Sequence, residues 1–303
     1  MDMGYFFRRL SSSDQSRYKK MILSLLERQK GVAISIPEVS CDRLIQSVLL
    51  DNPHLFMVNP TLFHYRQSNK TITIYWEYLF NRTEQKQVQR LLNQVTLNFN
   101  HHLIGLTKYE KVERLYQLFS RNVTYDRNSP FRHSLVGCLI HKRAVCQGIS
   151  TAFKFMCDRL EIPCLIVEGW SEGEKHTWNI VRINNKNYHI DVTWDLYPEE
   201  HEPTYFYFCK SDYDMNFDHS WDRRLYPTCP DNFGTFFAMH NLIFTEESLT
   251  EYLIQAIRTG KKICHFQISN PRIFGAVLNK LPAIGNIYYL SDTQLCSYHL
   301  RFL

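Results

Sequence analysis

Apolar residues recur at helical spacing in two segments near the start of the chain. Between residues 11 and 31 they fall at i, i+3, i+4, i+7 and i+8, after a serine-rich start and before Gly31. A second segment begins at the cap candidate Ser40 and must end before Asn52 and Pro53, because the residue before a proline disfavours helical backbone. We expect two amphipathic helices that pack together.

Residues 62–80 have a different pattern. "LFHYR" and "TITIYWEYLF" are rich in aromatic and β-branched residues, and a polar Ser-Asn-Lys triplet separates them. This pattern predicts a β-hairpin. A further helix is expected over roughly 85–100, and no group of residues in the first hundred suggests chemistry.

The middle of the chain again begins with a helix signal. Thr107 and Glu110 form a capping box, in which a hydroxyl and a carboxylate satisfy two free backbone amides, and the helix should run to about Asn122. The polar run "DRNSPFRHS" is expected to be a loop. Apolar spacing then predicts a helix from Cys146 to Leu160, so that Cys146 lies near its amino end.

After this helix the pattern changes to strands. "CLIVEGW" indicates a buried strand, residues 171–175 a loop and residues 177–194 a hairpin. Beyond Pro230 we expect a strand near 234–244, a helix over 245–260, and a strand-helix-strand-strand tail.

These elements predict an α+β protein with three regions. Residues 1–104 form an appended amino-terminal α+β region, residues 105–230 a core, and residues 231–303 a carboxyl-terminal α+β region. In the core, the helix that bears Cys146 is expected to pack on an antiparallel sheet.

Composition narrows the function classes. The chain has 303 residues, 44% of them hydrophobic and 21% charged, as in an ordinary globular protein. Its net charge is +5, but no run of five or six basic residues suggests nucleic-acid binding. Apolar runs are far shorter than the roughly 20 residues that a membrane span needs, and the first residues lack a signal-peptide pattern. We therefore expect a cytoplasmic protein that binds neither nucleic acid nor membrane.

The nine cysteines are scattered, odd in number and free of CxxC pairs. This favours a reducing compartment over a disulfide scaffold. Most of these cysteines should be small buried hydrophobic residues.

The hairpin can be analysed face by face. Asn184 and Asn185 tolerate the positive φ of a two-residue turn, and residues whose numbers sum to 369 then pair across the strands. The second strand is expected to run from Asn187 to Asp195, and with this turn His176 and Asp191 are diagonal neighbours on the polar face of the hairpin. Their Cβ atoms are then at most about 7–8 Å apart, close enough for imidazole to hydrogen-bond carboxylate.

A histidine oriented by an acid needs a group to activate, and Cys146 is the best candidate. Helix-start amides and a nearby imidazolium lower the pKa of a thiol and give a nucleophilic thiolate. Gly148 leaves room for a substrate backbone, and the Cys146 amide could donate to an oxyanion. For the second oxyanion donor, Gln147 and Trp178 are the two candidates.

Three segments resemble the bacterial transglutaminase-like superfamily: "RAVCQGISTAFKFMCDRLEIPCLIVEGW", "KHTWNIVRINNKNYHIDVTWD" and "FCKSDYDMNFDHSWD". The resemblance covers about 105–230. It implies a papain-like α+β core with a Cys, His, Asp triad, whose members fall on Cys146, His176 and Asp191. The chain departs from papains at Ile140, where they have an oxyanion glutamine.

The resemblance implies a thioester route for amide bonds of a protein or peptide substrate. Water as acceptor gives a protease or deamidase, and hydrolysis is our first expectation because nothing marks an amine site or a calcium switch. An amine acceptor would give transglutaminase-type acyl transfer. The rival from another class is a non-catalytic scaffold that binds peptide or glycan.

Other constellations are weaker. His189 shares the polar face and is a second candidate for the general base. "DYDMNFDHSWDR" imitates a calcium loop, but Phe217 stands where glycine is needed and Arg223 where a glutamate is needed. The histidines and cysteines lack zinc spacing. We therefore expect no metal and no cofactor, and the sequence does not reveal the oligomeric state.

Overall fold

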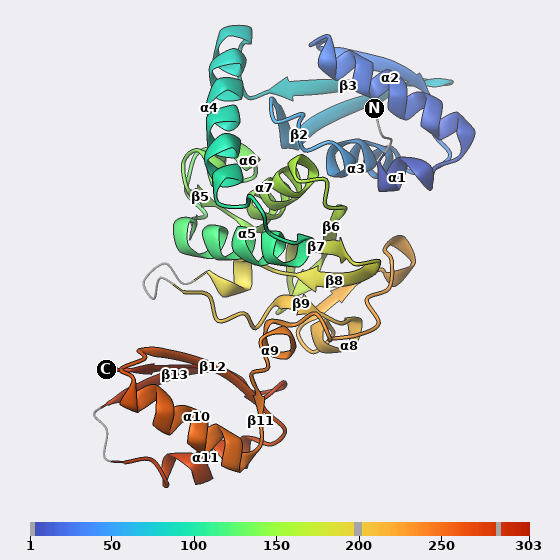
Figure 1. The fold of residues 1–303 in the computed structure, drawn as a ribbon. Helices are drawn as coiled ribbons and strands as arrows, with labels where there is room; N and C mark the ends of the chain where they lie inside the picture. The colour runs from blue at the N-terminus through green and yellow to red at the C-terminus, as the bar shows by residue number, and fades with distance from the viewer. Residues whose placement is uncertain (1–3, 197–201, 283–285) are drawn as a thin grey trace.

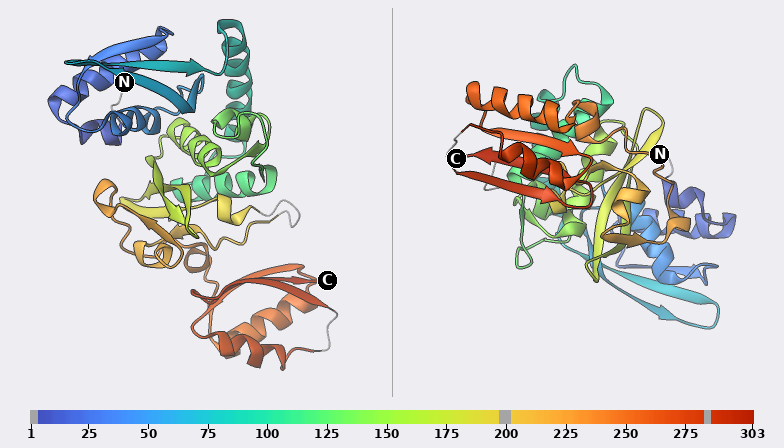
Figure 2. Two further views of the ribbon diagram at one scale, coloured as in Figure 1. Left: turned by 180° about the vertical axis from the view of Figure 1, so that it is seen from behind. Right: turned by 90° about the horizontal axis from the view of Figure 1, so that it is seen from below.

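The computed structural model describes residues 4–196, 202–282 and 286–303. Figure 1 shows three regions that follow one another along the molecule in chain order. Seen from behind, the carboxyl-terminal region again lies apart from the core (Figure 2, left). The fold combines helices with sheets of three, five, four and two strands. The predicted α+β class is therefore confirmed.

The amino-terminal region is a three-stranded antiparallel sheet with helices packed beside it. Its elements are α1 (Tyr5–Arg8), α2 (Ser12–Leu26), β1 (Gly31–Ser35), α3 (Cys41–Asp51), β2 (Val58–Gln67), β3 (Thr71–Tyr78) and α4 (Arg82–His101). The predicted hairpin is present as β2 and β3, and β1 pairs with the other edge of β3. Ser40 caps α3 as expected, because its side chain accepts from the Arg43 amide.

The first predicted helix ends earlier than expected. It was predicted to reach Gly31, but α2 ends at Leu26. Arg28 adopts a φ of 57°, which closes the helix, and Gly31 instead opens β1. Periodicity alone does not show that a short strand follows the turn.

The core is a five-stranded antiparallel sheet with one helix against a face. Its elements are α5 (Lys108–Asn122), β4 (Thr124–Tyr125), α6 (Leu135–Leu139), β5 (Arg143–Ala144), α7 (Cys146–Arg159), β6 (Cys164–Ser171), β7 (Glu174–Ile183), β8 (Lys186–Ile190), η1 (Thr193–Asp195), β9 (Phe208–Lys210), α8 (Asp212–Met215), β10 (His219–Trp221) and η2 (Arg223–Leu225). The strand order is β10-β6-β7-β8-β9. Helix α7 packs on β6 and β7, as predicted.

The turn and register of the β7–β8 hairpin agree with the sequence analysis. Asn184 and Asn185 have φ values of 49° and 65°, and Ile183 pairs with Lys186. The pairing ends at Asn179 with Ile190, however, so the prediction of a strand through residue 195 is wrong. Beyond Ile190 the chain turns into η1, and the expected pairing of later residues is absent from the described ladder.

The carboxyl-terminal region is a four-stranded sheet covered by helices. Its elements are α9 (Phe236–Met239), β11 (Ile243–Phe244), α10 (Glu246–Arg258), β12 (Ile263–Ile268), α11 (Pro271–Leu278), β13 (Ile287–Asp292) and β14 (Ser297–Phe302). The predicted helix and the strand-helix-strand-strand tail are confirmed. The strand predicted near 234–244 is wrong for its first part, because the Thr235 hydroxyl caps α9 by accepting from the Ala238 amide.

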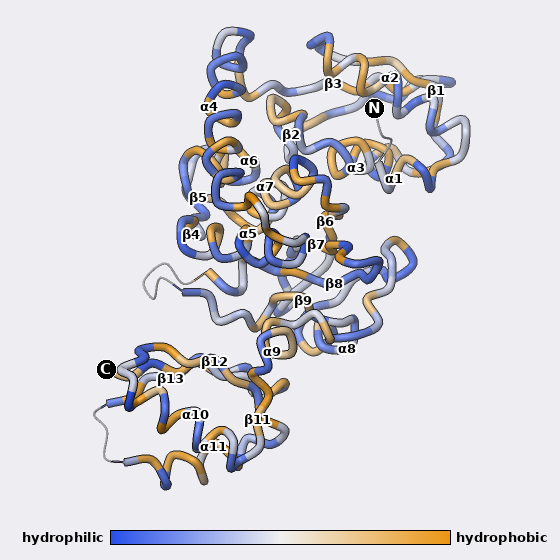
Figure 3. The backbone as a smooth tube through the Cα atoms, in the orientation of Figure 1, coloured by the Kyte–Doolittle hydropathy of each residue, from blue (hydrophilic) through white to orange (hydrophobic). Residues whose placement is uncertain are grey.

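Buried side chains show how the regions are joined. One hydrophobic core runs from Leu44 in α3 through Phe119 in α5 to Phe153 in α7, so the amino-terminal region and the core share it. A second hydrophobic core lies wholly within the carboxyl-terminal region. Figure 3 shows hydrophobic stretches of α7 and β6 in the interior of the molecule. The domain boundaries after residues 104 and 230 remain predictions.

Candidate active site

Cys146 is the first residue of α7, at the amino end of a helix whose start is held firmly. The preceding residue, Val145, has extended backbone, and its amide donates to the Arg132 carbonyl at 3.0 Å. No side chain caps this helix among the described residues. The first backbone amides of α7 therefore direct partial positive charge towards the sulfur.

Cys146 differs from the other eight cysteines in exposure and in acidity. It is the one cysteine that is not buried. Burial alone would raise the pKa of its thiol, but the hydrogen bond and charge of His176 and hydrogen bonds from Thr177 outweigh this and lower that pKa. By contrast, burial raises the pKa of Cys41 to about 11 and that of Cys138 to about 12. Only Cys146 has the environment of a thiolate.

His176 lies on β7, and Asp191 lies one residue beyond the end of β8. Their Nε2 and Oδ2 atoms are 2.5 Å apart, and both side chains are almost fully buried. Backbone hydrogen bonds also hold Asp191, because its amide donates to the Tyr207 carbonyl and its Oδ1 accepts from the Thr193 amide. The irregular chain after β8 thus fixes the carboxylate against the imidazole.

The charges of this pair support each other. Burial disfavours both charged forms, yet the Asp191 carboxylate and the Cys146 sulfur raise the pKa of His176 to about 10. The charge of His176, together with hydrogen bonds from His176 and His219, holds the pKa of Asp191 well below its usual range. Since Nε2 binds the carboxylate, Nδ1 is the ring nitrogen left to meet the sulfur. His176 thus bonds Asp191 and also lowers the pKa of the Cys146 thiol, which relates the three groups to one another.

The sequence analysis missed a second histidine on the same carboxylate. His219 Nε2 is 3.1 Å from Asp191 Oδ2, and His219 Nδ1 is 2.5 Å from Asp218 Oδ1. Tyr207 in turn donates to the other oxygen of Asp218 at 2.5 Å. His219 lies in the quoted segment "DHSWD", but only the pairing of β10 with β6 brings it beside the hairpin.

Trp178 was one candidate for the oxyanion donor and His189 the weaker candidate for the general base, and the structure pairs these two side chains with each other. The Trp178 indole is buried and donates from Nε1 to His189 Nδ1 at 2.9 Å, so it cannot serve a substrate oxyanion. His189 must then carry its proton on Nε2, which donates to Asp212 at 2.9 Å. Both ring nitrogens of His189 are thus engaged, which excludes it as the general base. The indole instead stacks on the His176 ring, with centroids 5.9 Å apart.

Two groups of three side chains bring possible metal-ligand atoms within 4.8 Å of one another: His176, Asp191 and His219, and His189, Asp212 and Cys229. In both groups each histidine has one ring nitrogen that bonds a carboxylate of the group: Nε2 of His176 and of His219 bonds Asp191, and Nε2 of His189 bonds Asp212. Their arrangement is that of a buried hydrogen-bond network.

Gly148 differs from expectation, whereas Gln147 stays a candidate for the second oxyanion donor. Gly148 is buried, and a Cβ there would lie 2.3 Å from the Arg132 carbonyl oxygen. Its small size therefore admits a neighbouring loop, and the idea that it leaves room for substrate is wrong. Oε1 of Gln147 lies 3.1 Å from His133 Nδ1, and both residues line a cleft.

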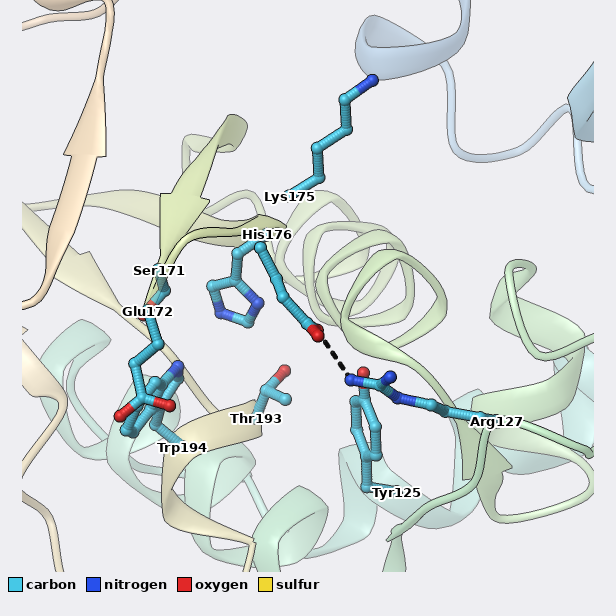
Figure 4. A pocket seen from close by; sticks show the side chains of 9 residues that line it. Tyr125, Arg127, Ser171, Glu172, Lys175, His176, Thr193 and Trp194 are labelled. Carbon is cyan, nitrogen blue, oxygen red and sulfur yellow. Dashed lines mark hydrogen bonds and ion pairs between the residues drawn. The ribbon is translucent and has the colours of Figure 1, made fainter.

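Two clefts lie beside the candidate triad. The larger has a volume of about 460 Å³ and is lined by His176, Thr193, Trp194, Tyr125 and Arg127, among others. Figure 4 shows the His176 ring and Thr193 facing this space. Arg127 and Glu174 also line it, and the Arg127 guanidinium donates to the Glu174 carboxylate at 2.7 Å. The second cleft is narrower and reaches Gln147 and Thr177 from the side of the amino-terminal region.

Comparison with known proteins gives a family for the core. Residues 83–192 match the family model of the transglutaminase-like superfamily, which confirms the resemblance seen in the sequence. No curated protein sequence matches the chain. No helix within the described residues is long and apolar enough to cross a membrane.

Three solved structures resemble parts of the chain. A TGase has 15% identity and a TM-score of 0.33, over 54% of this chain and 50% of its own. A protein of Cytophaga hutchinsonii described as a candidate cysteine protease has 12% identity and a TM-score of 0.31, over 47% of this chain and 64% of its own. Menin, whose structure reveals the binding site for Mixed Lineage Leukemia protein, has 15% identity and a TM-score of 0.30, over 68% of this chain and 49% of its own. The chain thus covers less than two thirds of each.

Proposed function

On the premise that this chain carries a transglutaminase-like core, we propose that it is a cysteine-dependent enzyme that acts on amide bonds of a protein or peptide. The observation that carries the proposal is the pair of His176 and Asp191, 2.5 Å apart, which acts on a partly exposed Cys146 at the start of α7 and lowers the pKa of its thiol. The nucleophile is the least buried thiol, at a helix start, with a lowered pKa. A purely structural cysteine needs none of these features.

The first half of the reaction forms a thioester. The Cys146 thiolate attacks the carbonyl carbon, and the Cys146 amide donates to the oxyanion. The imidazolium of His176 gives its proton to the leaving nitrogen, the C–N bond breaks, and an amine or ammonia departs. Asp191 keeps the imidazole oriented and stabilises its positive charge.

The second half releases the acyl group. Neutral His176 takes a proton from water, the water oxygen attacks the thioester carbonyl, and the thiolate leaves again. The product is a carboxylic acid, so the reaction is that of a protease or a deamidase. If a primary amine takes the place of water, the product is an amide, and the enzyme is a transferase.

Selective alkylation tests the proposal. At pH 6 iodoacetamide should label Cys146 before the other eight thiols, because only Cys146 has a stabilised thiolate. The preference should disappear in His176→Ala, while Cys41 serves as an internal buried control. Uniform slow labelling of all nine cysteines, resolved by mass spectrometry of peptides, would refute the proposal.

A second experiment decides the type of reaction. The protein is incubated with a glutamine-containing peptide and a primary amine, and mass spectrometry follows ammonia loss, chain cleavage and amine incorporation. We expect hydrolysis to exceed incorporation. Incorporation that outpaces hydrolysis would establish acyl transfer instead, and a Cys146→Ala variant controls for both.

A further inference from the structure

A buried ion pair joins the carboxyl-terminal region to the core. The ammonium of Lys210, on β9, donates to the carboxylate of Asp292, at the end of β13, over 3.3 Å. The two side chains are only 2% and 11% exposed, so water screens this pair weakly. Removing one partner of a buried ion pair leaves an uncompensated charge, which is costly. Without Asp292, the Lys210 ammonium would therefore need another acid.

Two further carboxylates lie within reach of the Lys210 charge, which acts through space on both Asp218 and Asp195. Asp195 already accepts hydrogen bonds from two hydroxyls and a backbone amide. The Asp218 side chain is 28% exposed and has fewer bonds, to Tyr207 and His219. Tyr207 lies between the two charges, because the ammonium is 4.1 Å from its ring centroid and its hydroxyl donates to Asp218. Asp218 is the acid to which an unpaired Lys210 would turn.

Asp218 matters to the candidate triad because it holds His219. His219 is 2.5 Å from Asp218 through Nδ1 and 3.1 Å from Asp191 through Nε2. Burial alone would lower the pKa of His219, but its bonds to both carboxylates raise it. The resulting imidazolium donates from both nitrogens. If Lys210 occupied Asp218, His219 would lose one of its two carboxylates, and its bond to Asp191 would weaken.

The segment between the carboxyl-terminal sheet and the triad also fixes the backbone of Asp191. The Tyr207 carbonyl accepts from the Asp191 amide at 3.0 Å. Four residues earlier, the Pro203 carbonyl oxygen lies 3.1 Å from His265 Nε2, on β12 of the carboxyl-terminal region. Residues 203–210 thus contact that region on one side and the candidate triad on the other.

We propose that Asp292 is a positioning residue of the candidate active site. Its ion pair holds the Lys210 ammonium away from Asp218. Asp218 thus stays bonded to His219, which supports Asp191. This inference rests on the proposed function and goes beyond it, because it gives the carboxyl-terminal region a part in the reaction.

Three variants separate this role from simple attachment of the two regions. Asp292→Asn removes the charge but keeps an Oδ1 for the Gln294 and Leu295 amides, so the turn after β13 should persist. Lys210→Met removes the cation and keeps an unbranched side chain, and the third variant combines both changes. Asp292→Asn alone should impair the site, because only then does an unpaired cation compete for Asp218. An ion pair that merely attached the regions would be damaged equally by either single change.

p-Nitrophenyl acetate separates the two halves of the reaction. The Cys146 thiolate attacks the acetyl carbonyl and nitrophenolate leaves in a burst, and water then hydrolyses the acetyl thioester with His176 as the base. In Asp292→Asn we expect the burst at its wild-type rate and the steady rate lower by about tenfold, since an oriented general base contributes roughly a hundredfold or more. Lys210→Met and the double variant should keep the wild-type steady rate.

The pH titration of His219, followed by NMR of isotope-labelled histidine, tests the inference without any substrate. Its signal is assigned by its loss in His219→Gln. The midpoint should fall by about 1 pH unit in Asp292→Asn, because a carboxylate that stabilises the imidazolium is drawn away, and should return in the double variant. Lys210→Met should leave the midpoint high, which keeps the inference falsifiable if Asp292→Asn folds poorly.

Glu246→Gln is the matched control, because it removes the carboxylate of another ion pair of the carboxyl-terminal region, with Lys280. It should change neither the steady rate nor the His219 midpoint. An unchanged His219 midpoint in Asp292→Asn, or an equal loss of steady rate in Lys210→Met, would overturn the inference. A wild-type protein that gives no burst at Cys146 would instead overturn the proposed function, and the titration would still decide whether Asp292 acts on His219.

Discussion

Replacing Gly148 with alanine should disturb the start of α7 and with it the position of Cys146. The new Cβ would lie 2.3 Å from the Arg132 carbonyl oxygen and 3.0 Å from both the Ser134 oxygen and the Ala144 Cβ. An ordinary carbon-oxygen contact is about 3.3 Å, so the helix and the loop must separate by about 1 Å. That movement breaks the hydrogen bond from the Val145 amide to Arg132, which is 3.0 Å long.

The expected loss of stability follows from these contacts. Overpacking costs about 1–3 kcal/mol and the broken hydrogen bond about 1 kcal/mol, while alanine in place of glycine returns up to about 1 kcal/mol of helix propensity. The free energy of unfolding should therefore fall by about 1–3 kcal/mol. A shift of about 1 Å at the nucleophile should lower turnover on the order of a hundredfold.

Urea denaturation followed by circular dichroism measures the stability, and the rate of Cys146 alkylation at pH 6 measures the geometry. Gly275→Ala is the matched control, because Gly275 also lies in a helix but has no atom within 4 Å of an added Cβ. It should be neutral or stabilising by up to about 1 kcal/mol. A Gly148→Ala protein with wild-type stability and wild-type alkylation would refute the steric reasoning.

Three further predictions concern the buried acids and histidines. Asp191→Asn should lower the pKa of His176, which the carboxylate raises, and so move the alkylation profile of Cys146 to higher pH; an unchanged midpoint would contradict this. In His219→Gln the side chain cannot hydrogen-bond both Asp191 and Asp218, as His219 does. The free energy of unfolding in urea should fall by about 1–3 kcal/mol, and kcat should fall with little change in KM. Wild-type kcat would show that His219 does not position Asp191. Burial raises the pKa of Asp195 from 3.8 to about 6. The folded protein therefore binds this proton more tightly than the unfolded chain, and the resulting gain in the free energy of unfolding is complete below pH 3.8 and is lost as the pH rises through about 6. Relative to Asp195→Asn, the wild type should lose roughly 3 kcal/mol between about pH 4 and 6.5, and parallel unfolding curves would disprove this.

Much of the local structure is readable in the sequence because it depends on neighbours in the chain. The capping box at Thr107 and Glu110 forms as predicted, and α5 begins directly after Thr107, at Lys108. The two asparagines at 184 and 185 adopt positive φ and set the register of the hairpin. In each case a few adjacent residues determine the backbone, and period-2 or helical spacing then extends the element.

The approach of His176 to Asp191 was also predicted, but partly for a wrong reason. The register brings the two residues to the same end of the hairpin, as expected. The strand was expected to continue past Asp191, whereas the chain turns there and Thr193 and Tyr207 fix the carboxylate. Strand alternation cannot show where a strand stops when an irregular segment supplies the hydrogen bonds.

The sequence by itself indicated most of the helices, the turn and register of the hairpin, the likeness of the core to a family, and Cys146, His176 and Asp191 as candidates for the triad. Only the tertiary structure decided that His219 shares Asp191, that Trp178 serves His189 rather than substrate, and that Gly148 accommodates a loop. These features depend on β10 lying beside β6 and on a distant loop packing under α7. Contacts between segments far apart in sequence leave no periodic signal, because many chain paths could satisfy the same local pattern.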